Sequence, residues 1–240
     1  MIENLPNWIN WLFLLTGVLT IGFFHYANGK PNKLTYLIII WSLIQAILAF
    51  TGFYEKTDLI PPRFLIVLIP VFITLIYGLT KRPLNWIIEN KNTKLSTFIH
   101  TIRFPVEIIL LYLYLNNMMP ELMTFEGRNY DILAGISAPI IGILFLKNII
   151  GRNALIIWNI IGLFLILFVF ANGILSSELP IQVFGFEQPT KAPNYFPFIL
   201  LPATIVPIVI YSHITDIIKL WKEKNSVQQR TELKNNSFLH

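Results

Sequence analysis

The residues best able to do chemistry in this sequence stand close together inside an apolar segment at 96–116. They are His100, Arg103 and Glu107. Spacings of three and four place side chains on one face of an α-helix. Ionisable groups within an apolar helix are costly and usually face a protein interior or water. Glu107 needs a partner there, and Arg103, one turn away, is the expected one. The group is a candidate proton relay or polar substrate site; an ion pair that only locks helix packing is the alternative.

Polar residues in two other apolar segments are expected at similar depth. Asn159 lies in the segment 154–174, and His213 lies near the end of the segment 196–218. The predicted intramembrane polar site therefore consists of His100, Arg103, Glu107, Asn159 and His213.

Histidine is a common metal ligand, and three histidines are expected near the same end of three apolar segments. They are His25, His100 and His213. The sequence contains no paired-ligand spacing such as HxxxH or HExxH. We therefore expect no metal or other cofactor, and a metal or haem held by these three histidines is the alternative.

Two connecting segments mix apolar with charged side chains, at 116–131 and at 184–189. We expect both to fold back over the outer end of the helices as a vestibule, with Arg128 paired to an acid. A packed structural loop is the alternative. The predicted vestibule residues are Glu121, Glu126, Arg128, Asp131, Glu187 and Gln188.

The elements that position these residues follow from composition. Of the 240 residues, 55% are hydrophobic and 13% are charged, against roughly 25% charged in a soluble domain. Apolar runs of about 20 residues are long enough to cross a bilayer. Seven such runs are present, at 8–27, 34–54, 62–80, 96–116, 131–149, 154–174 and 196–218. The sequence predicts an all-α polytopic membrane protein, with a seven-helix transmembrane domain at 1–222 and a polar, disordered cytoplasmic tail at 223–240.

The distribution of charge gives the orientation. If the N-terminus is outside, most of the 18 Lys and Arg residues fall in cytoplasmic segments, as the positive-inside rule requires. Omitting the short fifth run or the polar fourth run would break this alternation. The net charge of +5 is thus sorted towards the anionic inner leaflet, which argues against nucleic-acid binding. The absence of cysteine excludes disulfides, thiolate metal sites and cysteine nucleophiles.

Three segments carry a resemblance to a known family. They read ELMTFEGRNYDILAG at 121–135, RFPVE at 103–107 and FEQP at 186–189. Together they resemble an uncharacterised family of bacterial multi-span membrane proteins, over most of the chain from the fourth run onward. This resemblance implies no particular activity and adds no catalytic role.

Function is predicted from the site and the architecture. Ionisable groups within the fourth run, and prolines in the third, fourth, fifth and seventh runs, favour a small-solute or proton-coupled transporter-like bundle in the bacterial cytoplasmic membrane. Its expected partners are the lipid bilayer and a small polar solute or protons. A membrane-embedded histidine-dependent enzyme or redox protein is one alternative, and a sensor or interaction subunit is another. No catalytic residue is assigned, and no nucleotide-binding or hydrolase motif occurs.

Overall fold

The computed structural model describes residues 2–3, 5–57 and 59–237, with side chains to residue 226. Within these residues the chain is all-helical, and its extended structure is limited to one isolated bridge between Ser177 and Thr190. The long elements are α1 (Asn7–Ala27), α2 (Asn32–Phe50), α3 (Leu65–Gly78), α4 (Lys81–Asn90), α5 (Thr93–Ile99), α6 (Arg103–Leu115), α7 (Asp131–Leu146), α8 (Arg152–Leu175) and α9 (Val206–Ser237). The short elements are η1 (Phe53–Glu55), η2 (His100–Ile102), η3 (Glu121–Met123), η4 (Ala192–Asn194) and η5 (Leu201–Ile205).

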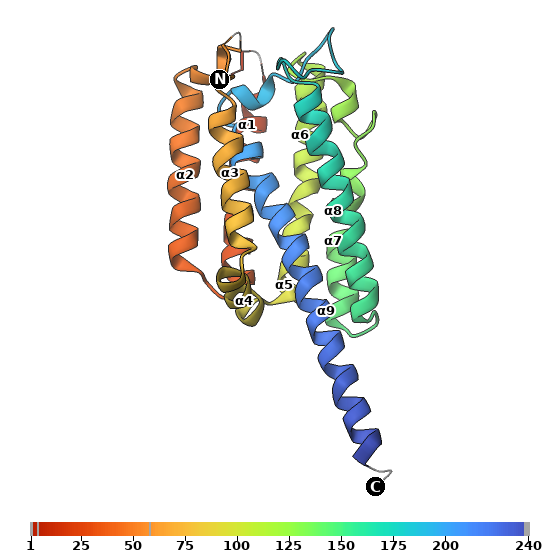
Figure 1. Cartoon of the computed structure of the whole chain (residues 1–240). Coiled ribbons are helices and arrows are strands. Elements are labelled where there is room, and N and C mark those ends of the chain that lie inside the picture. The colour runs from red at the N-terminus through yellow and green to blue at the C-terminus, as the bar shows by residue number, and fades with distance from the viewer. Residues whose placement is uncertain (1, 4, 58, 238–240) are drawn as a thin grey trace.

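The helices form one upright bundle (Figure 1). Every predicted apolar run coincides with a helix, or with a stack of consecutive helices such as α5, η2 and α6. Five of these are long and apolar enough to cross a membrane: α1, α2, the α5–α6 stack, α8, and η5 with the first part of α9. The helix α3 reaches that length only together with α4, which is bent from it by 71°, and α7 is apolar but has 16 residues. Several helices can therefore span a membrane, and the count of seven stays a prediction.

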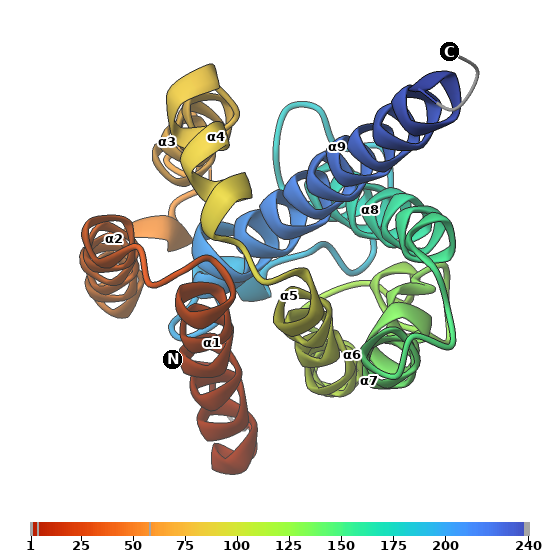
Figure 2. The ribbon, with the colours of Figure 1, turned by 90° about the horizontal axis from the view of Figure 1, so that it is seen from below.

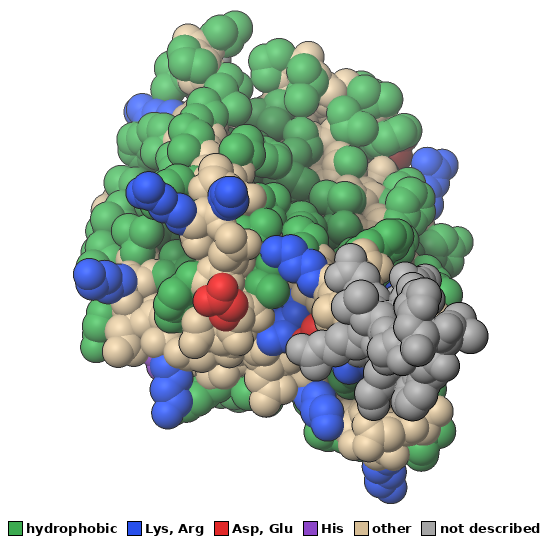
Figure 3. Space-filling model, turned by 60° about the horizontal axis from the view of Figure 1, so that its bottom comes forward, with side chains coloured by type: hydrophobic (Ala, Val, Ile, Leu, Met, Phe, Trp, Pro, Cys, Tyr) green, Lys and Arg blue, Asp and Glu red, His purple; other side chains and the backbone are tan. Residues whose placement is uncertain are grey.

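The side of the bundle is apolar and its interior holds polar groups. Large aliphatic and aromatic side chains such as Val18, Ile73 and Phe164 are more than half exposed. Figure 3 shows hydrophobic side chains over the flanks, with Lys and Arg gathered towards the lower end. The most buried polar residues include Arg103 and Asp216. Charged residues are almost never buried unless they are paired. The buried charged residues therefore indicate a site in the interior of the bundle.

The helix α7 packs through small residues. Ala134, Ala138 and Gly142, which recur every four residues, are all buried. A Cβ on Gly135 would lie 2.5 Å from the backbone nitrogen of Phe104, so the α7 backbone lies directly against α6. Small residues permit this close approach between helices. The contact places Asp131, the first residue of α7, beside the start of α6.

A tight turn joins α1 to α2 and holds the end of α4. Gly29 has a φ of +72°, which suits glycine, and a Cβ there would lie 2.6 Å from Cβ of Asn90. The backbone nitrogen of Asn92 donates to the carbonyl of Ala27 at 2.7 Å. These contacts fix Lys91 under the bundle interior.

The helix α9 extends beyond the rest of the bundle, as Figure 1 shows. The sequence predicts a disordered tail at 223–240, whereas the backbone of 223–237 continues α9 as helix. Lys, Glu and Gln are good helix formers, and extending an existing helix avoids the cost of nucleation. Residues 238–240 lie outside the described part of the chain, and the division into a transmembrane domain and a tail stays a prediction.

Candidate functional site

Arg103 is the centre of the buried polar groups. Its side chain is 2% exposed. Its Nε donates to Oδ2 of Asp131 at 2.6 Å, and an Nη donates to the other carboxylate oxygen. The same Nη donates to the carbonyl of Gly162 at 3.1 Å. A two-pronged arginine–carboxylate pair of this kind combines charge with fixed geometry.

The partner of Arg103 is thus Asp131, and the predicted pair with Glu107 is wrong. The prediction considered only residues on the same helix, where Glu107 is one turn away. The close approach of α7 at Gly135 brings a second carboxylate across the helix interface. Asp131, predicted to lie in the outer vestibule, is 3% exposed and belongs to the interior.

The protonation of His213 follows from its neighbours. Its Nε2 lies 3.1 Å from Nη1 of Arg103, and its Nδ1 lies 2.8 Å from Oδ1 of Asn159. A guanidinium can only donate, so Nε2 accepts and the proton is on Nδ1, which donates to Asn159. The amide of Asn159 is oriented by its own hydrogen bond to the carbonyl of Leu155 at 2.9 Å. The network therefore assigns a neutral imidazole to His213.

His100 stacks on His213, with ring centroids 3.7 Å apart and ring planes inclined by 14°. The rings of Trp158 and His100 pack edge to face, with their centroids 5.4 Å apart. Both ring nitrogens of His100 are buried without a partner among the described protein groups. Buried polar groups are normally hydrogen-bonded, so His100 marks unused hydrogen-bonding capacity in the interior.

Glu107 lies one helical turn beyond Arg103, is 1% exposed, and is held by Asn129. The amide nitrogen of Asn129 lies 2.7 Å from both carboxylate oxygens. The side-chain oxygen Oδ1 of Asn129 accepts from the backbone nitrogen of Asp131 at 2.9 Å, which links the two acids through one loop. Within the described residues Glu107 forms no ion pair. It also lines a cavity of about 70 Å³ with Asp131.

A second buried ion pair lies at the lower end of the bundle. Nζ of Lys91 is 3.3 Å from Oδ1 of Asp216, and both side chains are fully buried. Ser96 donates to the other oxygen of Asp216 at 2.6 Å. Burial lowers the pKa of Lys91, and the nearby carboxylate of Asp216 opposes that effect. Lys219 donates to the backbone carbonyls of Ile88 and Lys91, which ties α4 to α9.

These groups follow one another through the interior as a polar line. On the α5–η2–α6 stack its members recur at spacings of four, three and four, and this part covers about 16 Å. They are faced by α7 and α9. The members of the polar line are Ser96, His100, Arg103, Glu107, Asn129, Asp131, Asn159, His213, Asp216 and Lys91.

The short turn η2 keeps the polar-line residues of the α5–η2–α6 stack on one face. Pro105 has no backbone N–H to donate to Thr101, and its ring would collide with that carbonyl in a continuous α-helix. The chain therefore forms the 3₁₀ turn His100–Ile102 before α6 begins at Arg103. His100 and Arg103 remain on the face that points towards α9.

The predicted interior residues separate into two groups. His100, Arg103, Asn159 and His213 converge, with Glu107 next along the helix. His25 instead hydrogen-bonds Thr35 through Nδ1 at 2.8 Å. Among the described residues, no three or more His, Cys, Asp or Glu side chains could hold a metal ion together. His25 thus has a separate partner, whereas His100 and His213 stack on each other.

The two predicted vestibule segments meet at the upper end of the bundle. Nε2 of Gln188 donates to the carbonyls of Tyr114 and Met119, at 2.8 and 2.6 Å. Arg128 lies over the ring of Phe184 at 5.8 Å, so the expected pairing with an acid is replaced by a cation–π contact. The three glutamates of these segments, Glu121, Glu126 and Glu187, are exposed, whereas Asp131 is buried.

The sequence analysis missed four members of the polar line. One had a usable signal, because Asp216 lies three residues after His213 on the same helical face. Lys91 had no such signal, because it lies among other basic residues in a connection between two apolar runs. Ser96 and Asn129 are residue types common on any helix or loop, and only the fold brings them to the carboxylates.

Fold and interior together define an all-helical protein with several helices able to cross a membrane and a charged interior. A family model described as Domain of unknown function (DUF8737) matches residues 61–221, and the chain belongs to this family. The match fits the predicted membership of a family without a known activity, and it includes the whole polar line. No curated protein and no solved structure matches the chain.

The assignment of the Arg103 partner predicts the result of a double-mutant cycle. Asp131→Leu or Arg103→Met alone leaves a buried charge uncompensated, so each lowers the free energy of unfolding in detergent by about 3–5 kcal/mol. The double variant recovers most of that loss, because both charges are gone. The half-exposed pair Arg152–Glu223 is the control, and its coupling energy stays below about 1 kcal/mol. A larger coupling between Arg103 and Glu107 than between Arg103 and Asp131 would contradict the assignment.

Proposed function

We propose that this chain is an integral protein of the bacterial cytoplasmic membrane with seven spans, its N-terminus outside and its C-terminus inside. The apolar flanks and the five sufficiently long helices support insertion. The connections predicted to be cytoplasmic all lie at the lower end in Figure 1, where α9 also emerges. The exposed cations of that end fit an anionic inner leaflet.

The two shortest apolar helices are compatible with seven spans. The 16 residues of α7 cover about 24 Å, slightly less than a hydrocarbon core of about 30 Å. The connections before and after α7 nevertheless lie at opposite ends of the bundle, so the chain passes through it. Bending of α4 away from α3 ends the third span and lays α4 across the lower end.

We further propose that the protein is a proton-coupled transporter of a small polar solute, with the polar line as its proton path. One observation carries this proposal: carboxylates, imidazoles and a buried lysine succeed one another through a bundle whose outer surface is apolar. Intramembrane ionisable residues of this kind mark proton relays and ion pathways. An arrangement serving packing alone would not need two separate buried ion pairs.

The Arg103–Asp131 pair can couple proton arrival to a change of contacts. Protonation of Asp131 removes the charge that holds the guanidinium, and movement of Arg103 then releases Nε2 of His213 as a proton acceptor. His100, stacked on that ring, has two unpartnered nitrogens, and because stacked rings do not point their nitrogens at each other, the proton reaches His100 only after one ring turns. The local contacts thus supply two alternative arrangements, which a coupled carrier requires.

The adjoining cavity suits a small solute. Its volume of about 70 Å³ corresponds to about two water molecules at liquid density. Glu107 and Asp131 line it, and Ser177 and Thr190 line it from the end that carries the vestibule segments. We therefore place solute entry at the outer end, next to the two carboxylates that take up the proton.

The orientation can be tested by labelling, because the chain contains no cysteine. Single cysteines at Glu126 and Glu187, in the outer connections, react with a membrane-impermeant maleimide in intact cells. Single cysteines at Lys94 and Lys147, at the lower end, react only after permeabilisation. All four side chains are exposed, so burial does not confound the comparison. Labelling of the lower pair in intact cells would overturn the orientation.

The proton path can be tested in liposomes that contain a pH-sensitive dye, with a potassium diffusion potential as the driving force. Wild-type protein accelerates acidification over protein-free liposomes. Glu107→Gln and Asp131→Asn each slow it by roughly tenfold or more, because a titratable carrier is lost at nearly constant shape. Glu126→Gln, an exposed acid outside the polar line, leaves the rate unchanged. A wild-type rate equal to that of protein-free liposomes, or unchanged rates in both line variants, refutes the proposal.

A further inference from the structure

A second cavity, much larger than the one beside Glu107, lies away from the polar line. It has a volume of about 630 Å³ and lies between α2 and α3, with η5 and α9 behind it and α4 across its lower end. Figure 2 shows α2 and α3 standing apart, with α4 running from α3 towards the middle of the bundle. None of its lining residues belongs to the polar line. The cavity and the proposed proton path can therefore be altered by separate substitutions.

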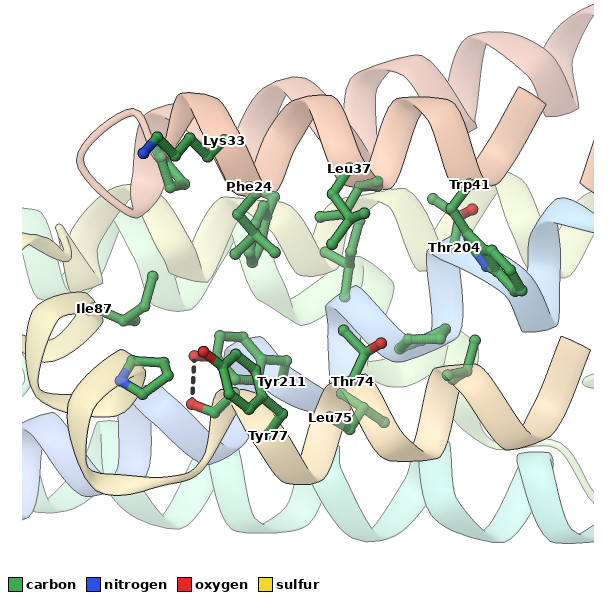
Figure 4. Close-up of a pocket in the computed structure, with 18 of the residues that line it drawn as sticks. Phe24, Lys33, Leu37, Trp41, Thr74, Leu75, Tyr77, Ile87, Thr204 and Tyr211 are labelled. Atoms are coloured by element: carbon green, nitrogen blue, oxygen red, sulfur yellow. Dashed lines mark hydrogen bonds between the residues drawn. The ribbon is translucent and has the colours of Figure 1, made fainter. Parts of the chain in front are cut away.

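The walls of this cavity are apolar along most of their length. Figure 4 shows Leu37 and Trp41 of α2 facing Leu75 of α3, with Tyr211 of α9 deeper. Ile40 of α2 and Ile73 of α3, on the neighbouring surface, are more than half exposed. An apolar cavity beside an apolar flank is stabilised by an apolar occupant.

Positive charge is concentrated at one end of the cavity. Lys30 and Lys33, in the turn between α1 and α2 and the first turn of α2, are lining residues with exposed side chains. Lys81 and Arg82, both exposed, directly precede the lining residue Pro83 at the start of α4. Basic pockets between transmembrane helices on the cytoplasmic side bind anionic lipid head groups.

We infer that this cavity binds one acyl chain of an anionic phospholipid, with the lipid phosphate against Lys30 and Lys33. The inference rests on the proposed membrane location. Trp41 lies eight residues after Lys33, which corresponds to about 12 Å along the helix, close to the thickness of about 15 Å for one hydrocarbon leaflet. A head group at the basic end therefore places the chain along the cavity up to Trp41.

The occupant can be tested by native mass spectrometry of purified protein titrated with phosphatidylglycerol or phosphatidylcholine. We expect one phosphatidylglycerol to bind more tightly than phosphatidylcholine. The double variant Lys30→Gln/Lys33→Gln weakens phosphatidylglycerol binding by about thirtyfold, because two lysines near the phosphate are lost. The matched control Lys94→Gln/Lys147→Gln removes the same charge at the same end, away from the cavity, and keeps the wild-type affinity.

A second variant tests the cavity separately from its charge. Leu37→Trp narrows the cavity and weakens binding of both lipids while leaving the basic residues in place. Equal affinity for the two lipids, or equal loss in the charge variant and its control, overturns the inference. The liposome test of proton flux uses variants of polar-line residues, whereas the lipid test uses variants of cavity residues. A negative result for lipid binding therefore does not count against the transport proposal. If the protein does not insert into membranes, the cysteine labelling test fails as well.

Discussion

The packing of the helices depends on a buried arginine, Arg103, with one carboxylate partner, Asp131. Placing Arg103 and Asp131 inside an apolar bundle is costly, and the cost is offset only when both hydrogen-bonding prongs are formed. That requirement explains the backbone contact at Gly135, which brings α7 close enough. It also explains Gly162, where a Cβ would lie 2.5 Å from the His213 ring and within 3.3 Å of Arg103. Two glycines thus make room for one charged pair.

The surrounding network ties this pair to His213 and Asn159. His213 accepts from Arg103 on one side and donates to Asn159 on the other, so its ring is fixed in a single tautomer. Loss of charge on Asp131 would remove the reason for Arg103 to stay in place. The neighbouring carboxylate of Glu107, without an ion pair in the described residues, lies next to the same cavity. Both ring nitrogens of His100 are buried without a partner among the described residues, which is unusual for buried polar groups.

The sequence predicted the helices well and the contacts between them less well. Every apolar run corresponds to helix, because hydrophobic length is a local property. His100 and Arg103 were predicted from helical periodicity, which puts them on one face, and Asn159 and His213 from their expected depth in two other apolar runs. The choice of Asp131 over Glu107 as partner depended on how closely α7 approaches α6, which no local pattern encodes. Lys91 and Asp216, far apart in sequence, meet only because α4 turns under the bundle.

The protonation state of His213 tests the central claim most directly, because it depends on Arg103 being in place as a donor. Nitrogen-15 NMR of histidine-labelled protein at neutral pH, with His213→Gln to assign the signal, distinguishes the forms of the ring. The network requires a neutral ring protonated on Nδ1, with Nε2 bare, and Asp131→Asn should disturb that signal. An imidazolium, or a proton on Nε2, would mean that Arg103 does not face His213 and that the polar line is broken at its centre.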